Sequence, residues 1–266
     1  MPDTEFAGHA PDPVVQYRVE GGAATLTLDS PHNRNAISAA MMDQLRGGLD
    51  AAARDPRVRA VVLTHKGGTF CAGADLSEST DDPDEAAAQR TRDMVGLLRG
   101  ILELPKPVIG VVDGHVRAGG MGLVGACDMV VAGPRATFAL TEVRLGLAAS
   151  IISLTVLPRM VPRAAGRYFL TGERFGPQEA MDTGLVTFVA EQPAERAAEL
   201  VSDLQECSPQ GLAESKHLLT MGMLGDFDRH AEALAARSAR LFGSPEAAEG
   251  VAAFLQKRPP SWSPGR

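Results

Sequence analysis

Three short segments of the chain contain residue types that could stabilise an anion and move a proton. The first is 70–76, where Ala72, Gly73 and Ala74 are small enough for the backbone to approach a ligand closely with its N–H groups available. An ordinary glycine turn, in which Asp75 caps the next helix, would have a similar composition. Taken alone, this segment favours the ordinary turn.

The second segment is 113–122, which follows a β-branched apolar run and opens an apolar helix. Its free amides and the helix dipole would face the same way, an arrangement that stabilises a developing negative charge. Close packing between the helix and the preceding strand would also require small residues here. The two explanations are about equally supported by this segment alone.

The third segment is 138–146, where Glu142 stands at the end of a short apolar strand. A partly buried carboxyl group has a raised pKa and can shuttle a proton near neutral pH. The alternative is a surface glutamate paired with Arg144. An isolated glutamate would favour that alternative.

The elements that must position these segments alternate between apolar strands and amphipathic helices over the first 150 residues. Strands are expected on both sides of Gly21 and Gly22 and over 58–63, 108–112, 129–132 and 138–140, and helices over about 37–49 and 85–104. From Ser150 onward, strand signals almost disappear and proline and glycine punctuate successive helices. The pattern predicts an α/β core followed by a helical C-terminal third.

Composition narrows the class of protein. The chain has 266 residues, 44% of them hydrophobic, and a net charge of −7, so no general basic field favours nucleic acid or an anionic membrane as a partner. Its three cysteines form neither a zinc motif nor a closed disulfide framework. The N-terminal residues lack a signal-peptide pattern, and no apolar run is long enough to span a membrane. These observations predict a cytoplasmic protein.

The order and spacing of the three segments resemble those of the crotonase (enoyl-CoA hydratase/isomerase) superfamily. The similarity extends from about Val14 to Trp262 and is specific for the superfamily rather than for one reaction. Further matches are Pro31, Asn35, Ala36, Gly114, Gly120, Cys127, Asp128 and the closing 254–258 segment.

The resemblance implies a fold and an assembly. The expected fold class is α/β, a crotonase-like spiral of ββα units with a helical C-terminal trimerisation region. We expect a flexible arm over 1–13, the ββα core over 14–200 and the helical region over 201–266. The implied assembly is a homotrimer or a dimer of trimers. The substrate would be an acyl-CoA, with coenzyme A as part of it, and no metal or permanently bound cofactor is expected.

The resemblance also implies roles for individual residues. The backbone N–H groups of Ala74 and Gly119 would form an oxyanion hole around the thioester oxygen, with Glu142 as the principal acid/base. Lys257 or Arg258 could reach a CoA phosphate, although solvated C-terminal charges are the simpler explanation. The CoA and pantetheine track would be lined by Arg34, Ala36, Ala72, Asp75 and Leu76. The acyl group would be contacted by Arg117, Ala118 and Thr141.

Two departures from the family pattern bear on the reaction. Characterised hydratases of the family use two glutamates; one matches Glu142, but the other matches Gly122, which has no carboxylate. One carboxylate could still act twice, first taking a proton from water and then delivering it to Cα. The 147–151 segment is also poorer in proline and glycine than the family pattern, so water could be placed differently there.

The favoured function is therefore an enoyl-CoA hydratase, a lyase of fatty acid or lipid metabolism. One alternative is a methylglutaconyl-CoA-type hydratase, in which Arg117 would meet a substrate carboxylate. Others are a Δ3,Δ2-enoyl-CoA isomerase, for which one carboxylate suffices, and a non-catalytic acyl-CoA binding protein. A cysteine hydrolase is poorly supported, because the surroundings of Cys71 suggest a small apolar filler. His115 could supply acid/base function, although a structural role is simpler. The sequence does not identify the acyl chain.

Overall fold

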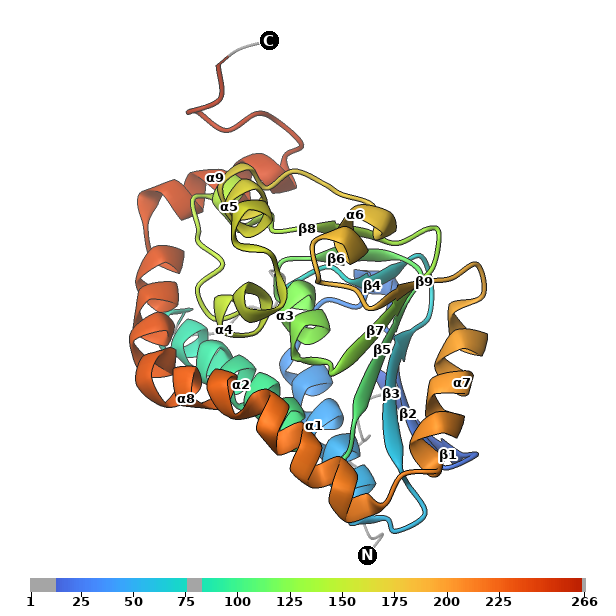
Figure 1. Cartoon of the computed structure of the whole chain (residues 1–266). Coiled ribbons are helices and arrows are strands. Elements are labelled where there is room, and N and C mark those ends of the chain that lie inside the picture. The colour runs from blue at the N-terminus through green and yellow to red at the C-terminus, as the bar shows by residue number, and fades with distance from the viewer. Residues whose placement is uncertain (1–12, 76–82, 265–266) are drawn as a thin grey trace, which may run out of the picture.

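The fold is built on a six-stranded sheet with a smaller three-stranded sheet beside it, as the computed structural model in Figure 1 shows. The structure describes residues 13–75 and 83–264. Strands β1 (Val15–Glu20) and β2 (Ala23–Leu28) form an antiparallel hairpin around the expected glycine turn. Every other pairing in the large sheet, whose order is β1-β2-β3-β5-β7-β9, is parallel.

Three successive units of the chain share one pattern: a strand of the large sheet, a strand of the small sheet, and then a helix. The first unit is β3 (Ala60–His65), β4 (Thr69–Cys71) and α2 (Pro83–Glu103). The second is β5 (Val108–Val112), β6 (His115–Arg117) and α3 (Gly119–Ala126). The third is β7 (Met129–Ala132), β8 (Thr137–Ala139) and the 3-10 helix η2 (Glu142–Leu145). The expected ββα repetition is therefore confirmed.

Helices cover both faces of the large sheet, which explains why its central parallel strands are almost continuously apolar. On one face, α7 (Pro193–Gln205) buries Ala197, Leu200 and Val201 against Ile109 and Val131. On the other face lie α1 (Ala39–Arg54), α2 and α3, whose apolar sides form the main core. The N-terminus of α1 is capped by the Ser38 side chain, which accepts a hydrogen bond from the Met41 N–H.

The C-terminal part of the chain is helical, as expected, except for the short strand β9 (Phe188–Val189) at the edge of the large sheet. The expected division at residue 200 falls inside α7, and the long helix α8 (Pro209–Phe242) begins beyond it. The shorter elements are α4 (Ser153–Val156), η3 (Leu157–Arg159), α5 (Pro162–Thr171), α6 (Pro177–Asp182) and α9 (Pro245–Leu255). Among the described residues, no helix has both the length and the apolar character that a membrane span needs.

A buried ion pair fastens α8 to the core. The side chains of Lys216 and Asp128 are only 4% and 10% exposed, and Lys216 Nζ lies 2.8 Å from Asp128 Oδ2. The ammonium group also donates to the carbonyls of Ile101 (2.8 Å) and Lys106 (3.0 Å), and Asp128 Oδ2 accepts a hydrogen bond from the Val108 N–H. The pair therefore joins α8, the end of α2 and the starts of β5 and β7.

Lys216→Met should destabilise the fold strongly, because it leaves the Asp128 carboxylate buried without its cation. Loss of one partner of a buried pair costs about 3–5 kcal/mol. Urea denaturation would measure this loss, with Arg229→Met on the same helix as the control. Arg229 pairs with Asp226 at the surface, so its loss should change the unfolding free energy far less. Equal losses in the two variants would contradict the anchoring role of Lys216.

Candidate active site

The three chemistry-bearing segments meet because each follows one strand of the small sheet. The strands pair in the order β4-β6-β8, and both pairings are parallel. Ala74 follows β4, Gly119 follows β6 and Glu142 follows β8. Parallel strands end at the same edge of their sheet, which is where ligands bind in open α/β folds. The sheet therefore brings the loops with the two backbone amides and the carboxyl group to one edge.

The Ala74 and Gly119 loops are in direct contact. A Cβ atom built on Gly73 would lie 2.8 Å from Ala118 Cβ and 3.6 Å from Gly119 N, so only glycine allows this approach; Gly73 also has a φ of +96°. Within the described part of the chain, neither the Ala74 N–H nor the Gly119 N–H donates a hydrogen bond to a protein acceptor. Accessible amides without an internal acceptor are what an oxyanion requires.

Ala118, which precedes Gly119, has an unusual backbone conformation, with φ 46° and ψ −119°. Non-glycine residues rarely adopt positive φ, and such strain persists only where the surroundings enforce it. Here the Ala118 N–H donates to the Ala139 carbonyl at the end of β8, and the Ala118 carbonyl accepts from the Met121 N–H. These bonds fix the turn that sets the direction of the Gly119 N–H.

The 30–37 loop packs beside the Ala74 loop. Ile37 N–H donates to the Gly73 carbonyl, and the Asp75 N–H donates to the Ile37 carbonyl. Asn33 Nδ2 also donates to Asp75 Oδ2 at 2.9 Å. The buried Asn35 side chain binds the carbonyls of 66 and 69, which ties the loop to the β3–β4 connection.

Four of the five residues expected along the CoA track therefore lie on two adjoining loops. Arg34 and Ala36 are on the 30–37 loop, and Ala72 and Asp75 flank Gly73 on the other. The fifth, Leu76, lies outside the described residues. Arg34 is exposed, whereas Ala36 is buried, which is compatible with a contact through backbone atoms alone.

Glu142 has the electrostatic character of a proton shuttle. The residue is only partly exposed, and its Oε2 atom is buried without a hydrogen-bond partner among the described residues. Burial raises the pKa of its carboxyl group from 4.5 to about 7, partly opposed by a hydrogen bond from its own backbone N–H. The group can therefore both accept and donate a proton near neutral pH.

The η2 turn that presents Glu142 is held from two sides. A Cβ atom on Gly250 of α9 would lie 2.5 Å from the Leu145 carbonyl oxygen, and one on Gly146 would lie 2.7 Å from the Glu246 backbone. The C-terminal helix thus packs directly on the backbone of the turn. On the other side, Arg144 Nε donates to the Thr171 carbonyl at the end of α5 (3.0 Å). Among the described residues, the buried Oε2 of Glu142 has no hydrogen-bond partner, so Arg144 does not bind this oxygen.

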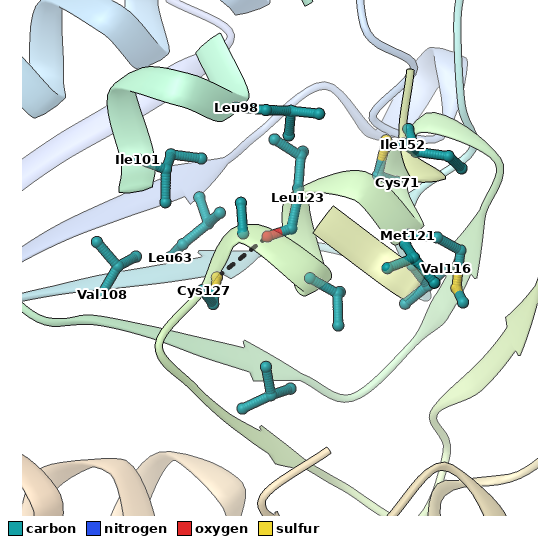
Figure 2. Close-up of a cluster of buried hydrophobic side chains, with 14 of the residues drawn as sticks. Leu63, Cys71, Leu98, Ile101, Val108, Val116, Met121, Leu123, Cys127 and Ile152 are labelled. Atoms are coloured by element: carbon teal, nitrogen blue, oxygen red, sulfur yellow. Dashed lines mark hydrogen bonds between the residues drawn. The ribbon is translucent and has the colours of Figure 1, made fainter. Parts of the chain in front are cut away.

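Gly122, the residue expected to match the second glutamate of the family, faces an apolar side chain. A Cβ atom at this position would lie 2.5 Å from Ile152 Cγ2, 3.0 Å from Ile152 Cβ and 3.3 Å from Leu98 Cδ1. Both side chains belong to the buried cluster that Figure 2 shows. The space into which a residue-122 side chain would project is therefore filled by hydrocarbon.

Arg117 is held among the strands of the small sheet. Its Nη1 donates to the carbonyls of Val116 (2.8 Å) and Thr137 (2.7 Å), and its Nη2 donates to Thr137 Oγ1 (2.9 Å). Burial, together with the nearby Arg174, lowers the pKa of Arg117 to about 10. The guanidinium group thus lies at the level of Thr137, two residues before the end of β8. His115 binds the same Thr137 hydroxyl, and its ring is exposed.

The remaining sequence candidates take clear positions. Thr141 directly precedes η2. Cys71 is fully buried, and this burial raises the pKa of its thiol to about 12, so it is an unreactive filler. Arg258 forms two hydrogen bonds with the Glu249 carboxylate of its own chain. Two grooves, of about 480 and 420 Å³, border α8, and none of the strand-end residues lines either one.

Comparisons with known proteins agree with this geometry. Residues 18–265 match the family model described as enoyl-CoA hydratase/isomerase. The 2,3-dehydroadipyl-CoA hydratase of Escherichia coli is 34% identical over 89% of this chain and 93% of its own length. The 1,2-epoxyphenylacetyl-CoA isomerase of the same organism is 33% identical over 94% and 98%. The crystal structure of an enoyl-CoA hydratase from Mycobacterium avium has a TM-score of 0.89 at 54% identity, covering 95% of this chain and 100% of that one.

Gly122→Ala should destabilise the protein, because the added methyl group would overlap Ile152. Overpacking of this kind costs about 1–3 kcal/mol. Gly47→Ala is the matched control: it also lies within a helix, but nothing lies within 4 Å of its added Cβ. The control should stabilise slightly, since alanine favours helices over glycine. Thermal and urea unfolding of both variants would test the contact, and equal effects would contradict it.

Glu142 should also make stability depend on pH in an identifiable way. Because its pKa is raised on folding, its contribution is fully present below pH 4.5 and is lost as the pH rises through about 7. Ionisation of the buried group then costs the folded state roughly 3 kcal/mol. Relative to wild type, Glu142→Gln should therefore gain stability between pH 5 and pH 8. The exposed Glu191→Gln is the control, and a pH-independent difference for Glu142→Gln in urea unfolding would refute the effect.

Proposed function

This chain belongs to the enoyl-CoA hydratase/isomerase family, and we propose that it is an enoyl-CoA hydratase-type enzyme with Glu142 as its single acid/base carboxylate. The observation that most supports the proposal is the buried, unpartnered Oε2 of Glu142, with a pKa near 7. Glu142 follows β8, which pairs with β6, the strand that leads to Gly119. The Gly119 loop is in contact with the Ala74 loop. The groups proposed as the proton shuttle and the anion site thus follow neighbouring strands at one edge of the small sheet.

In this proposal, the amides of Ala74 and Gly119 bind the thioester oxygen of the substrate. In hydration, the Glu142 carboxylate removes a proton from water while the water oxygen bonds to C3. The electron pair of the C2–C3 double bond moves toward the thioester, and the enolate charge on oxygen is stabilised by the two amides. The Glu142 carboxylic acid then returns the proton to C2, which restores the carboxylate and completes the addition of one water molecule.

Coenzyme A is proposed to enter as part of the substrate along the two adjoining loops that contain Arg34, Ala36, Ala72 and Asp75. The 30–37 loop is hydrogen-bonded on both sides of Ala74, at the Gly73 carbonyl and the Asp75 N–H. This supports the placement, because the pantetheine arm and the thioester belong to one extended molecule. Ala118 and Thr141, at the ends of β6 and β8, would border the acyl group. The substrate-binding role expected for Arg117 has weaker support, since strand carbonyls and Thr137 already accept its hydrogen bonds.

A Δ3,Δ2-enoyl-CoA isomerase is the second candidate, and the glycine at 122 favours it. In isomerisation, the Glu142 carboxylate takes a proton from C2 of a 3-enoyl-CoA, and the amides stabilise the dienolate. The same carboxylic acid then delivers the proton to C4, so the double bond moves from C3–C4 to C2–C3 without water. This reaction needs only one carboxylate.

We also propose the trimeric assembly that the family resemblance implies. Exposed apolar side chains on α8 support it: Leu218, Leu219 and Met221 are 68%, 72% and 58% exposed in the single chain. Several large apolar side chains exposed close together on one helix are typical of an interface. The number of subunits, including a dimer of trimers, would follow from the mass of the protein in solution.

Glu142→Gln should abolish turnover while leaving substrate binding nearly unchanged. The amide is similar in shape but cannot take up a proton, and loss of an acid/base group costs about 10²–10⁴ in rate. Mass spectrometry of crotonyl-CoA reactions would report the addition of water, the gain of conjugated enoyl absorbance with 3-hexenoyl-CoA would report isomerisation, and calorimetry would report binding. Rates of wild-type protein should also fall below pH 7, as Glu142 becomes protonated. Wild-type binding without turnover would instead identify an acyl-CoA binding protein.

A further inference from the structure

The outer face of the small sheet carries basic side chains that the proposed proton transfers do not use. In the β6–β8 ladder, Val116 pairs with Phe138 and Arg117 pairs with Ala139. The side chains of Val116 and Phe138 are fully buried in the main core. Because successive side chains of a strand point to opposite faces, Arg117 and His115 point away from this core, to the outer face.

Arg174 extends this basic group across β8. Phe175 forms an antiparallel bridge with Phe138, and each N–H of the pair donates to the other carbonyl at 3.0 Å. Phe175 is buried, so Arg174, one residue earlier, lies beside Ala139 and points to the same face as Arg117. Neighbouring strands are about 4.8 Å apart, which places the backbones of the two arginines about 10 Å apart. The residue between them, Ala139, has only a methyl side chain.

The positive charge of Arg117 has no negative partner in the part of the chain that the structure describes. Its three hydrogen bonds go to two strand carbonyls and the Thr137 hydroxyl, which are all neutral. A guanidinium group has five N–H donors, so at least two remain available. Arg174 is exposed and also forms no ion pair with a described residue. Glu173, the acid next to it in the chain, is bound by Arg167.

The basic groups are close enough to influence one another. Burial first, and then the charges of Arg117 and Arg174, lower the pKa of His115. Burial first, and then Arg174, lower the pKa of Arg117 to about 10. No carboxylate of the described residues opposes either shift. An anion placed between these groups would therefore relieve their mutual repulsion.

We propose that His115, Arg117 and Arg174 form a binding site for a divalent oxyanion of the phosphate class on the outer face of the small sheet. Arginine binds phosphate through paired N–H groups, and a phosphate has enough oxygens to meet donors from two sides. The bonds to the strand carbonyls and Thr137 fix the Arg117 guanidinium group, so one side of the site is formed in advance. The site does not rest on Glu142-dependent chemistry, because it lies on the face of the sheet rather than at the strand ends.

Arg174→Met tests the site by direct binding of inorganic phosphate. Calorimetry and the phosphate-dependent rise of the unfolding midpoint would be measured at pH 7, with sodium chloride keeping the ionic strength constant. The wild-type protein should bind phosphate, and the variant should bind it about tenfold more weakly or worse, since a hydrogen-bonded charge is lost. Arg163→Met is the matched control. Arg163 is an exposed arginine at the other end of α5, without an ion pair among the described residues, and its loss should not change the affinity.

Arg174→Glu provides a second test that does not depend on loss of binding alone. The new carboxylate should pair with Arg117 and take the place of the anion. Without phosphate, its unfolding midpoint should therefore exceed that of the wild type, and phosphate should not raise it further. The midpoint of Arg174→Met without phosphate should be no lower than that of the wild type, because the substitution removes a repulsion from an exposed position. These midpoints would show that both variants are folded.

Two comparisons define the ligand and the independence of the site. Glycerol 3-phosphate that binds more tightly than inorganic phosphate would assign the site to a phosphorylated metabolite, and weaker or equal binding would assign it to the free ion. The phosphate effect should persist when coenzyme A is saturating, since the site is separate from the proposed coenzyme A track. Its loss under coenzyme A, or equal phosphate affinity in the wild type and Arg174→Met, would overturn the proposal.

Discussion

The parallel pairing of three short strands is the constraint on which the site depends. Strands β4, β6 and β8 contribute only three residues each, yet their ladder brings the ends of three successive ββα units to one edge. Each unit adds one loop there, and the loops follow directly from the strands that the sheet fixes. A change in the register of one strand would therefore move a backbone amide or the Glu142 carboxyl group away from the other two.

Close backbone contacts then set the finer geometry. Gly73 allows the Ala74 loop to touch the Gly119 loop, Gly122 and Gly125 allow α4 to lie on α3, and Gly250 allows α9 to lie on η2. At Gly73, Gly125 and Gly250 a larger residue would push two segments of the chain apart, and at Gly122 it would collide with the Ile152 side chain. The glycines thus act through packing between elements, and the C-terminal helix contributes to the site although it contains no proposed catalytic residue.

Much of this arrangement could be predicted from the sequence, because local patterns determine it. Apolar β-branched runs indicated β3, β5 and β7, and the helical spacing of apolar residues indicated α1 and α2. The carboxyl group at the end of β8 was also recognisable. Ile152 opposite Gly122 was not, since this contact joins residues thirty positions apart and depends on the packing of α4. The same holds for Lys216, whose charge on a long amphipathic helix suggests solvent rather than a buried partner.

The state of Glu142 shows why such a site needs a rigid frame. A carboxyl group with an unpartnered buried oxygen favours its protonated form, so the fold must oppose the tendency of the turn to open and expose the group to water. Packing of α9 on the η2 backbone, the Arg144 bond to Thr171 and the Leu147 N–H bond to the Glu142 carbonyl all oppose that opening. A hydrogen-bond donor beside Oε2 would stabilise the folded protein more simply, but it would favour the carboxylate and lower the pKa. The raised pKa is therefore maintained because the surrounding packing, rather than a polar partner, holds the carboxyl group in place.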